Sequence, residues 1–209
     1  MGTKIWGPLG WMTLHSVSAI YPEQPTQAER LLIEEFIGAF RDTIACPYCK
    51  NHFTAMFNKY KQNHPEWSSN RQSLFMFICR AHNTVNRRLD KPIYKTVSEC
   101  IETLKQATSN KTPAEFRKAY LDYLVRNWTR QADGEGLMMM GFVRKMIKIN
   151  NEYLNLRDVK YSDITIQEDN VLEFIPENNS NYRATPNVPD PIHYRNIQIG
   201  FKNGSFIKR

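Results

Sequence analysis

Apolar residues in the first half of the chain recur at intervals of three and four positions, the spacing that places them on one face of an α-helix. The pattern predicts helices near residues 6–20, 26–44, 47–63, 69–89 and 96–104. Two of these begin at a threonine that is followed three positions later by a glutamate, which is a capping pair. Four long helices with short connections indicate an antiparallel bundle, to which the fifth, short helix is added.

The second half of the chain begins at a polar stretch, residues 108–112, which we interpret as a domain boundary. A capping threonine, a proline and a glutamate within 112–115 start a helix, and a glycine-containing break at 133–136 ends it. A second helix is expected from 137 to about 156. These two segments predict a helical hairpin.

The remaining residues indicate a small amount of β-structure. Residues 171–175 are typical of a strand, 178–191 are rich in Asn and Pro and predict a loop, and Asn203-Gly204 is a strong hairpin signal. We therefore expect a mainly α protein with two domains. Residues 1–107 would form the helical bundle, and residues 108–209 an α+β domain with a helical hairpin and a small β tail.

Composition narrows the class of protein. The 209 residues are 41% hydrophobic and 12% aromatic, which is too apolar for a disordered chain. Four cysteines are too few for a disulfide-rich scaffold. No apolar stretch is long enough to cross a membrane, and the first residues lack the apolar run of a signal peptide. We expect neither a transmembrane segment nor a secretory leader.

The net charge of +7 comes from 28 basic and 21 acidic residues. Divided at residue 107, the first part holds 13 basic and 9 acidic residues and the second 15 and 12, so the excess is shared by both parts. Because a nucleic-acid-binding domain usually collects its charge on one face, we expect no nucleic acid partner, and no membrane partner either.

Cys46-Pro-Tyr-Cys49 lies where the third helix is expected to begin. Unpaired N–H groups and the helix dipole favour a thiolate at this position, and the spacing lets the two sulfurs meet across one turn. Three interpretations remain open at this point: a redox pair, half of a zinc site, or a structural pair. A thioredoxin-like fold would need strands around the motif, whereas here a helix precedes it.

A polar stripe runs along the fourth predicted helix, where His82 and Asn86 lie one turn apart with Asn83 beside them. Trp11 and His15 form a second such face on the first helix. Each set alone is compatible with an ordinary buried core. Together, in a bundle, they would suit a flat heteroaromatic ligand with polar edges.

Several motifs follow one another in a fixed order over residues 5–105. They are Trp6-Gly7-Pro8 to His15, Tyr21-Pro22, Cys46-Pro-Tyr-Cys49, Cys79-Arg-Ala-His82-Asn83-Thr-Val-Asn86-Arg-Arg-Leu89-Asp-Lys91-Pro92, and Cys100. Taken together they resemble the Erv/ALR family of FAD-linked sulfhydryl oxidases. The resemblance implies a four-helix bundle with a short fifth helix, which agrees with the periodicity.

The resemblance also implies roles for the four cysteines. Cys46 would exchange disulfides with substrate thiols, and Cys49 would lie beside the flavin. Electrons would pass from substrate proteins through this pair to FAD and then to molecular oxygen, giving hydrogen peroxide. Cys79 and Cys100 match a structural disulfide that ties the fifth helix to the fourth. No cysteine then remains for a shuttle pair.

The positions that match the family's flavin surroundings lie on the first, third and fourth helices and in the turn after the fourth. They are Gly7, Trp11, His15, Tyr21, Cys49, His52, Phe53, His82, Asn83, Val85, Asn86, Leu89, Lys91 and Tyr94.

The resemblance further implies a homodimer packed through the first helices. The combination of an extra domain with no signal peptide is most similar to oxidases of large DNA viruses, which act in host cytoplasm or in the virion. The alternative hypothesis is a zinc-stabilised protein-interaction module that uses the same cysteines, with no enzyme activity. The natural substrate and the role of residues 108–209 are left open by the sequence.

Overall fold

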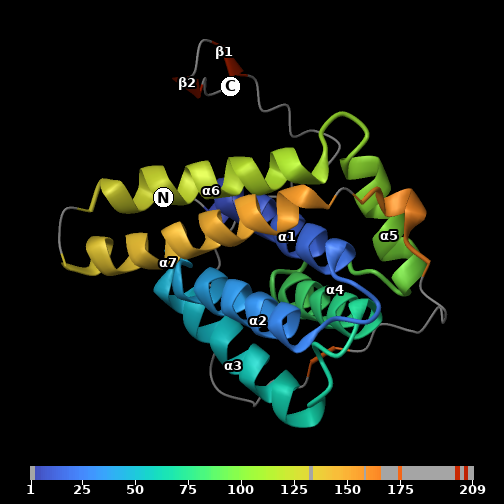
Figure 1. The fold of residues 1–209 in the computed structure, drawn as a ribbon. Coiled ribbons are helices and arrows are strands. Elements are labelled where there is room, and N and C mark those ends of the chain that lie inside the picture. The colour runs from blue at the N-terminus through green and yellow to red at the C-terminus, as the bar shows by residue number, and fades with distance from the viewer. Residues whose placement is uncertain are drawn as a thin grey trace.

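The fold was taken from a computed structural model, which describes residues 3–131, 134–157, 159–165, 174–175, 201–202 and 205–206. These residues form seven α-helices, two 3₁₀ helices and one two-stranded sheet (Figure 1). The α-helices are α1 Thr3–Ile20, α2 Gln27–Asp42, α3 Pro47–Asn63, α4 Arg71–Arg88, α5 Val97–Ala107, α6 Pro113–Thr129 and α7 Gly134–Glu152. The 3₁₀ helices are η1 Leu154–Leu156 and η2 Tyr161–Asp163, and the strands are β1 Phe201–Lys202 and β2 Ser205–Phe206.

The helices α1 to α5 confirm the predicted bundle with its short fifth helix. The predicted capping residues are in place, because Thr26 accepts the backbone N–H of Glu29 at the start of α2 and Thr96 accepts that of Glu99 at the start of α5. Asn70 caps α4 by accepting the N–H of Ser73. The ends differ from the prediction by no more than three residues, since helix ends depend on single capping contacts.

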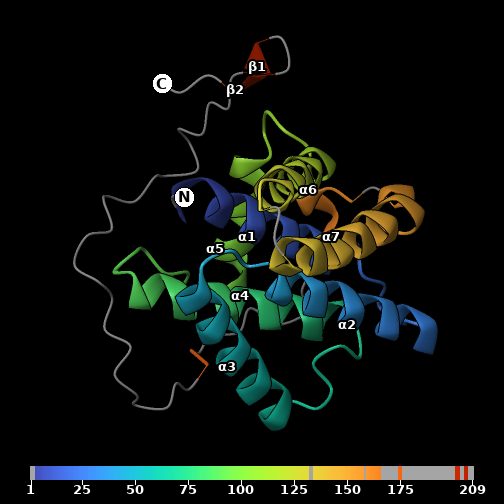
Figure 2. The same cartoon turned by 90° about the vertical axis from the view of Figure 1, so that its left-hand side faces the viewer.

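α1 is the central helix of the fold. It packs against α4 on one side and against α6 on the other, while α2 lies beside α3 and α7 (Figures 1 and 2). Gly10 allows this close packing on α1, since a Cβ there would lie 3.2 Å from the ring of Phe40 on α2 and 3.5 Å from that of Tyr120 on α6. The candidate residues Trp11 and His15 therefore sit in the middle of the molecule.

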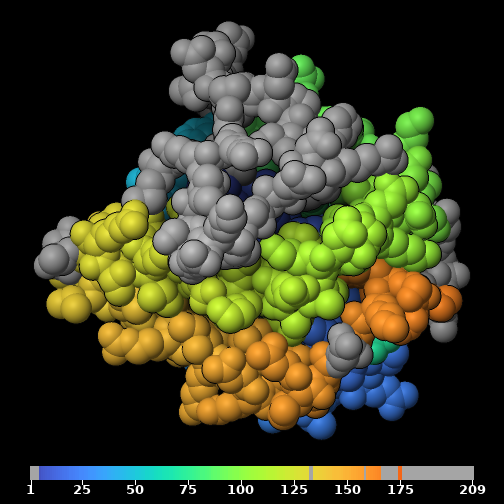
Figure 3. Space-filling model, turned by 90° about the horizontal axis from the view of Figure 1, so that it is seen from above, coloured from blue at the N-terminus to red at the C-terminus, as the bar shows by residue number. Residues whose placement is uncertain are grey.

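The predicted helical hairpin is confirmed as α6 and α7, which run side by side across the face seen in Figure 3. The hairpin covers α1 and α2, and its apolar residues belong to the same hydrophobic core as those of the bundle. Trp128 at the end of α6 donates its indole N–H to the backbone carbonyl of Thr43, at 3.3 Å. The predicted division into two folding units after residue 107 stays a prediction.

Arg117 ties the hairpin to α1 from inside the core, where it is only 1% exposed. Its guanidinium donates to Asn150 of α7 at 2.9 Å, to the hydroxyl of Ser16 on α1, and to Asn155 of η1 at 3.1 Å. A buried cation is costly unless hydrogen bonds replace its hydration. These bonds therefore fix the hairpin in one position next to His15.

The start of α7 differs from the prediction. The helix begins at Gly134, so the second predicted glycine, Gly136, lies inside it instead of in the break. A Cβ at Gly136 would lie 1.9 Å from the backbone carbonyl oxygen of Gln131, so only glycine fits where α7 leaves α6. This glycine permits a close approach of two backbones rather than ending a helix.

The C-terminal predictions are met in part. β1 and β2 pair antiparallel, with Phe201 opposite Phe206, around the predicted Asn203-Gly204 turn, whose own residues lie outside the described part. The strand expected at 171–175 is wrong at Phe174 and Ile175, which form no strand. Instead Ile175 is buried and its N–H donates to the hydroxyl of Thr84 on α4, at 3.0 Å. Residues 171–173 and the loop predicted at 178–191 lie outside the described residues.

None of the described helices combines the length and the apolar character that a membrane span requires.

Candidate active site

The motif Cys46-Pro-Tyr-Cys49 forms the start of α3, as predicted. Cys46 is the N-cap, and its sulfur accepts the backbone N–H of Cys49 at 3.2 Å. Pro47 occupies the first turn, where its missing N–H leaves no bond unmade. Cys46 and Cys49 are joined by a disulfide, with their Cα atoms 5.2 Å apart. The helix start thus presents an oxidised pair with a backbone N–H directed at one sulfur.

The surroundings of this pair are half open. Both cysteines are half-buried, and the side chain of Tyr48 between them is 39% exposed. The guanidinium carbon of Arg88, in the last turn of α4, lies 5.1 Å from the centre of the Tyr48 ring. The end of α4 therefore borders the disulfide, and solvent reaches both.

An aromatic and histidine cluster lies behind the disulfide. The rings of Trp11 on α1 and His82 on α4 stack with their centres 4.4 Å apart and their planes at 10°. His15 Nε2 and His82 Nδ1 lie at hydrogen-bond distance, 3.0 Å. Phe53, one turn after Cys49, brings α3 to this cluster, because its ring centre is 6.5 Å from that of Trp11. The structure therefore joins the two faces that the sequence singled out.

The two histidines of the cluster are uncharged at neutral pH. Burial lowers the pKa of His15 to about 3. Burial also lowers the pKa of His82 well below its usual value, and the nearby His15 and Lys91 lower it further. One buried atom, Nδ1 of His15, has no hydrogen-bond partner within the described part of the protein. The His15 ring therefore offers a neutral donor or acceptor at Nδ1 to whatever lies against it.

Asn83 and Tyr94 are hydrogen-bonded to each other, side chain to backbone. The Asn83 side chain donates to the Tyr94 carbonyl at 2.7 Å and accepts its N–H at 2.9 Å. This pair of bonds holds the turn after α4 against the helix. The Tyr94 ring then meets the edge of His82, with centres 5.6 Å apart. Asn83 thus positions the site through Tyr94.

Asn86 and Lys91 lie at the end of α4. Asn86 is buried, and its side-chain amide bonds no other side chain among the described residues. The backbone N–H of Lys91 donates to the Asn86 carbonyl at 2.9 Å, which fixes the turn. Burial lowers the pKa of the half-buried Lys91 ammonium, and none of the described carboxylates pairs with it. An anionic partner at this position would stabilise the charged form of Lys91, which burial disfavours.

The other predicted residues are less closely tied to the cluster. Gly7 lies on α1 one turn before Trp11, with open space where a Cβ would project. His52 is buried on α3, and Val85 and Leu89 are half-buried at the end of α4. Tyr21 is fully buried, and its hydroxyl donates to the Ser68 carbonyl at 2.8 Å, away from the ring cluster.

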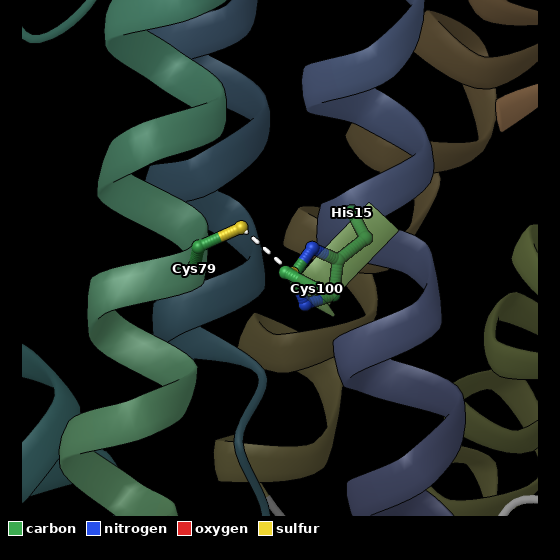
Figure 4. Close-up of side chains that lie close together, drawn as sticks. All are labelled: His15, Cys79 and Cys100. Atoms are coloured by element: carbon green, nitrogen blue, oxygen red, sulfur yellow. Dashed lines mark hydrogen bonds between the residues drawn. The ribbon is translucent and has the colours of Figure 1, made fainter. Parts of the chain in front are cut away.

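Cys79 of α4 and Cys100 of α5 point toward one another beside His15 (Figure 4). Their sulfurs are 2.8 Å apart and not bonded, and both residues are completely buried. Burial, and then the contact with Cys100, raise the pKa of the Cys79 thiol well above its usual value. The predicted pairing of these cysteines stays a prediction, although the fold brings the two sulfurs together.

His15, Cys79 and Cys100 together form a group that a metal could bind, since their ligand atoms lie within 4.8 Å of one another. Two thiolates on one tetrahedral zinc would be separated by about 3.8 Å, given a zinc–sulfur distance of ~2.3 Å. The observed 2.8 Å is shorter. The arrangement is therefore closer to that of a cysteine pair than to that of zinc ligands.

The cluster meets the requirements of a flavin. A flavin ring needs flat apolar faces and hydrogen-bond partners for its polar edges, and its diphosphate needs a cation. Trp11 and His82 supply flat rings, each with one face covered by the other. The orphaned Nδ1 of His15 and the amide of Asn86 supply polar partners, and Lys91 supplies a partly desolvated charge. The residues present therefore fit the group that the sequence resemblance implies.

Sequence reasoning missed two residues that border this site. Arg88 reaches Tyr48, and Phe75 packs on His15 with ring centres 6.0 Å apart. The only sequence signal for Tyr48 was its place inside the cysteine motif. Arg88 lies inside the motif that begins at Cys79 but had no role assigned, and Phe75 gave no signal, because their contacts depend on how α4 packs against its neighbours.

The comparisons with known proteins agree with the geometry. The sequence model of the Erv1 / Alr family matches residues 9–107. The chain is 35% identical over 88 residues to FAD-linked sulfhydryl oxidase ERV2 of Saccharomyces cerevisiae, which is 42% of this chain and 43% of that protein. It is 32% identical over 92 residues to protein 347L of Invertebrate iridescent virus 6, which is 43% of this chain and 83% of the viral protein.

A second viral relative extends further along the chain. "Probable FAD-linked sulfhydryl oxidase R368" of Acanthamoeba polyphaga mimivirus is 28% identical over 116 residues, 56% of this chain and 80% of that protein. The chain spans less than half the length of the yeast relatives that it matches.

Proposed function

The chain belongs to the Erv1/Alr family, and from this membership we propose that it is an FAD-dependent thiol oxidase that makes disulfide bonds in substrate proteins. The observation that supports the proposal best is the disulfide Cys46–Cys49 at the half-open start of α3. Through Phe53 the same helix reaches the stacked rings of Trp11 and His82.

The first step is a thiol–disulfide exchange at Cys46. A substrate thiolate attacks the Cys46 sulfur and forms a mixed disulfide, and the bond between the two enzyme sulfurs breaks. Cys49 leaves with the electron pair as a thiolate. Its position within the first turn of α3 favours this charge, because the helix dipole is positive at this end.

The second step releases the product. A second substrate thiolate attacks the substrate sulfur of the mixed disulfide, which forms the substrate disulfide and frees Cys46 as a thiolate. The N–H of Cys49, 3.2 Å from the Cys46 sulfur, stabilises this leaving group. Two substrate thiols have then lost two protons and two electrons, and the electrons reside on the enzyme's cysteines.

The predicted cofactor residues would hold FAD behind the pair. Trp11 and His82 would face the flavin ring, His15 and Asn86 would meet its polar edges, Lys91 would meet the diphosphate, and Asn83 would position the turn that carries Tyr94. FAD, when bound, would take the two electrons from the reduced pair and pass them to molecular oxygen, giving hydrogen peroxide.

The second cysteine pair would be structural in this proposal. Cys79 and Cys100 would form a disulfide that ties α5 to α4, as supported by the 2.8 Å between their sulfurs. Their complete burial keeps them from substrate thiols. One pair then cycles while the other stays fixed.

The assembly and setting are proposals of the same kind. A homodimer follows from the family resemblance. In this chain α6 and α7 cover α1 and α2, so a second copy would need other surfaces of these helices than those already covered. The viral relatives support an enzyme that acts on virion proteins in host cytoplasm or in the virion.

Two measurements on the purified full chain test the function. The protein should be yellow, with flavin absorbance near 450 nm, and it should consume oxygen and produce hydrogen peroxide with dithiothreitol. A colourless protein that contains zinc would contradict the oxidase and support the alternative, a zinc-stabilised interaction module.

A further inference from the structure

The net positive charge of the chain lies in the segment that begins at the reactive disulfide. Residues 46–95 contain nine basic and two acidic residues, a net charge of +7, and the rest of the chain contains 19 of each. The whole net charge of the protein therefore belongs to this one segment. A division of the chain at residue 107 hides this, because it adds the acidic helix α2 to the basic segment.

The two helices of this segment contain no carboxylate at all. α3 and α4 carry seven cations and no aspartate or glutamate. Arg71 is paired with Glu23 at 3.0 Å, and Arg80 donates to the hydroxyl of Tyr60. The five other cations have no ion pair with any described carboxylate; they are Lys50, Lys59, Lys61, Arg87 and Arg88.

Aromatic rings hold three of these cations in place of carboxylates. Lys61 lies 4.5 Å from the ring centre of Phe57, Arg87 3.9 Å from that of Phe174, and Arg88 5.1 Å from that of Tyr48. A ring face attracts a cation without neutralising its charge. The cations are thus ordered and still able to attract an anion.

Some cations on the other surface helices are paired with carboxylates. Lys145 of α7 is 2.6 Å from Glu35 of α2, and Lys118 of α6 is 2.7 Å from Asp122. The only acids within the basic segment are Glu66, which lies 3.6 Å from His64, and Asp90, which is exposed in the turn after α4. Arg144 of α7 also has no ion pair with a described carboxylate, but α3 and α4 differ from α2, α5, α6 and α7 in carrying no acid of their own.

We propose that the end of α4 and the start of α3 form a docking surface for an acidic stretch of the substrate polypeptide next to its reactive cysteine. Lys50 is adjacent to Cys49, Arg88 lies over Tyr48 inside the cysteine motif, and Arg87 is exposed one position before it. An acidic segment held here would bring its cysteine to Cys46. The same cations would stabilise the attacking thiolate.

A polypeptide fits this surface better than the other polyanions. The basic segment contains the disulfide, and only a partner with thiols can react with it, whereas nucleic acids and lipids carry none. Lys61, in the last turn of α3, lies about 16 Å from Lys50 at a rise of ~1.5 Å per residue, so a short extended peptide docked at the start of α3 would reach it. Nucleic acid and anionic membrane are the alternatives that the experiment must exclude.

The inference rests on the proposed thiol oxidase, so the experiment separates the two. Reduced peptides with the same cysteine pair, flanked by four glutamates, four glutamines or four lysines, serve as substrates of the full chain, and dithiothreitol serves as the uncharged reference. The peptide kcat/KM should fall in the order glutamate, glutamine, lysine, with about tenfold between the extremes at low ionic strength. Added salt should reduce this difference, because it screens exposed charges.

Charge-reversal variants locate the surface. In the double variant K50E/R87E the ratio of kcat/KM between the glutamate and lysine peptides should fall to one or below. The matched control, K118E/K148E, changes the net charge equally on α6 and α7, and it should keep the wild-type ratio. Equal loss in both double variants would overturn the docking surface, because the effect would then follow net charge alone.

A binding measurement keeps the two proposals distinguishable. Peptides with serine in place of cysteine cannot react, so fluorescence anisotropy reports docking even if the chain oxidises no thiol. Binding of the glutamate peptide, lost in K50E/R87E, supports the surface. Equal kcat/KM for all peptides, with dithiothreitol still oxidised, would overturn the surface alone. Tighter binding of single-stranded DNA or of phosphatidylserine vesicles than of the glutamate peptide would also overturn it.

Discussion

The two cysteine pairs of this protein lie in opposite environments. Cys46 and Cys49 are half-buried at the start of α3, are bonded to each other, and have an exposed tyrosine between them. Cys79 and Cys100 are completely buried between α4 and α5, next to His15. The same side chain is thus placed once where a partner can reach it and once where nothing can.

The difference shows how the fold assigns chemistry to a cysteine. At the helix start, backbone N–H groups favour a thiolate and solvent gives access, which together make a sulfur reactive. In the core, desolvation raises the pKa of the Cys79 thiol and excludes attack. A variant at the first pair should therefore change turnover, and one at the second pair should change stability.

The largest expected effect is the loss of turnover on replacing either cysteine of the first pair with serine. Cys46→Ser and Cys49→Ser should lower oxygen consumption with dithiothreitol by about 1,000-fold or more, equivalent to ~4 kcal/mol of activation free energy. Both should still bind FAD, because serine leaves the ring cluster intact. Turnover retained in Cys49→Ser would show that the proximal cysteine is assigned wrongly.

The second pair should show the reverse result. Replacing Cys79 and Cys100, which are 21 positions apart, with alanine removes the proposed cross-link and should lower the free energy of unfolding by about 3 kcal/mol. Turnover per bound flavin should remain within about twofold of wild type. Denaturant titrations with and without a strong reductant provide the control. The reduced wild-type protein should lose most of its stability advantage over the alanine variant. Identical midpoints under both conditions would contradict the disulfide.

The buried histidines should also make the stability of the fold depend on pH. Because burial lowers the pKa of His15 to about 3, the unfolded chain, with a histidine pKa near 6.5, binds a proton that the folded chain refuses between these values. Stability should therefore fall as the pH falls from 6.5 toward 3, by up to about 1.4 kcal/mol per pH unit for this residue. His82, whose pKa is also lowered by burial, adds to the slope.

Urea titrations at pH 7 and pH 5 measure this loss. His15→Gln should make the pH dependence shallower, because it removes the proton-binding group that the folded chain keeps neutral. An unchanged slope in His15→Gln would mean that the imidazole is not held neutral by burial.

The helices and their starts could be predicted because their signals are local. Thr26, Thr96 and Thr112 each accept an N–H three residues later, a contact that depends on adjacent sequence alone. The cysteine pair at a helix start and the stripe of His82 and Asn86 followed from the same periodicity. The family resemblance then related these positions to a flavin.

The rest depends on contacts between distant segments. The burial of Arg117 against Ser16 joins positions 101 apart, and no pattern within α6 indicates it. The role of Asn83 in holding Tyr94 could not be separated from direct cofactor contact by spacing alone. The charge concentration around Cys46 was present in the sequence, but the fold was needed to show which segments belong together.

The smallest expected effect concerns the N-caps of α3 and α5, the helices that carry Cys46–Cys49 and Cys100. Thr96 caps α5, which carries Cys100, by accepting the Glu99 N–H at 3.3 Å, while the corresponding cap of α3 is the sulfur of Cys46 itself. Thr96→Ala should lower the free energy of unfolding by about 1 kcal/mol, and Thr96→Ser should restore most of it. Neither change should alter oxygen consumption with dithiothreitol, because this cap serves only the static pair. A lower turnover in Thr96→Ala, measured where both variants are fully folded, would mean that the buried region takes part in the redox cycle and that the contrast between the two pairs is one of position and not of role.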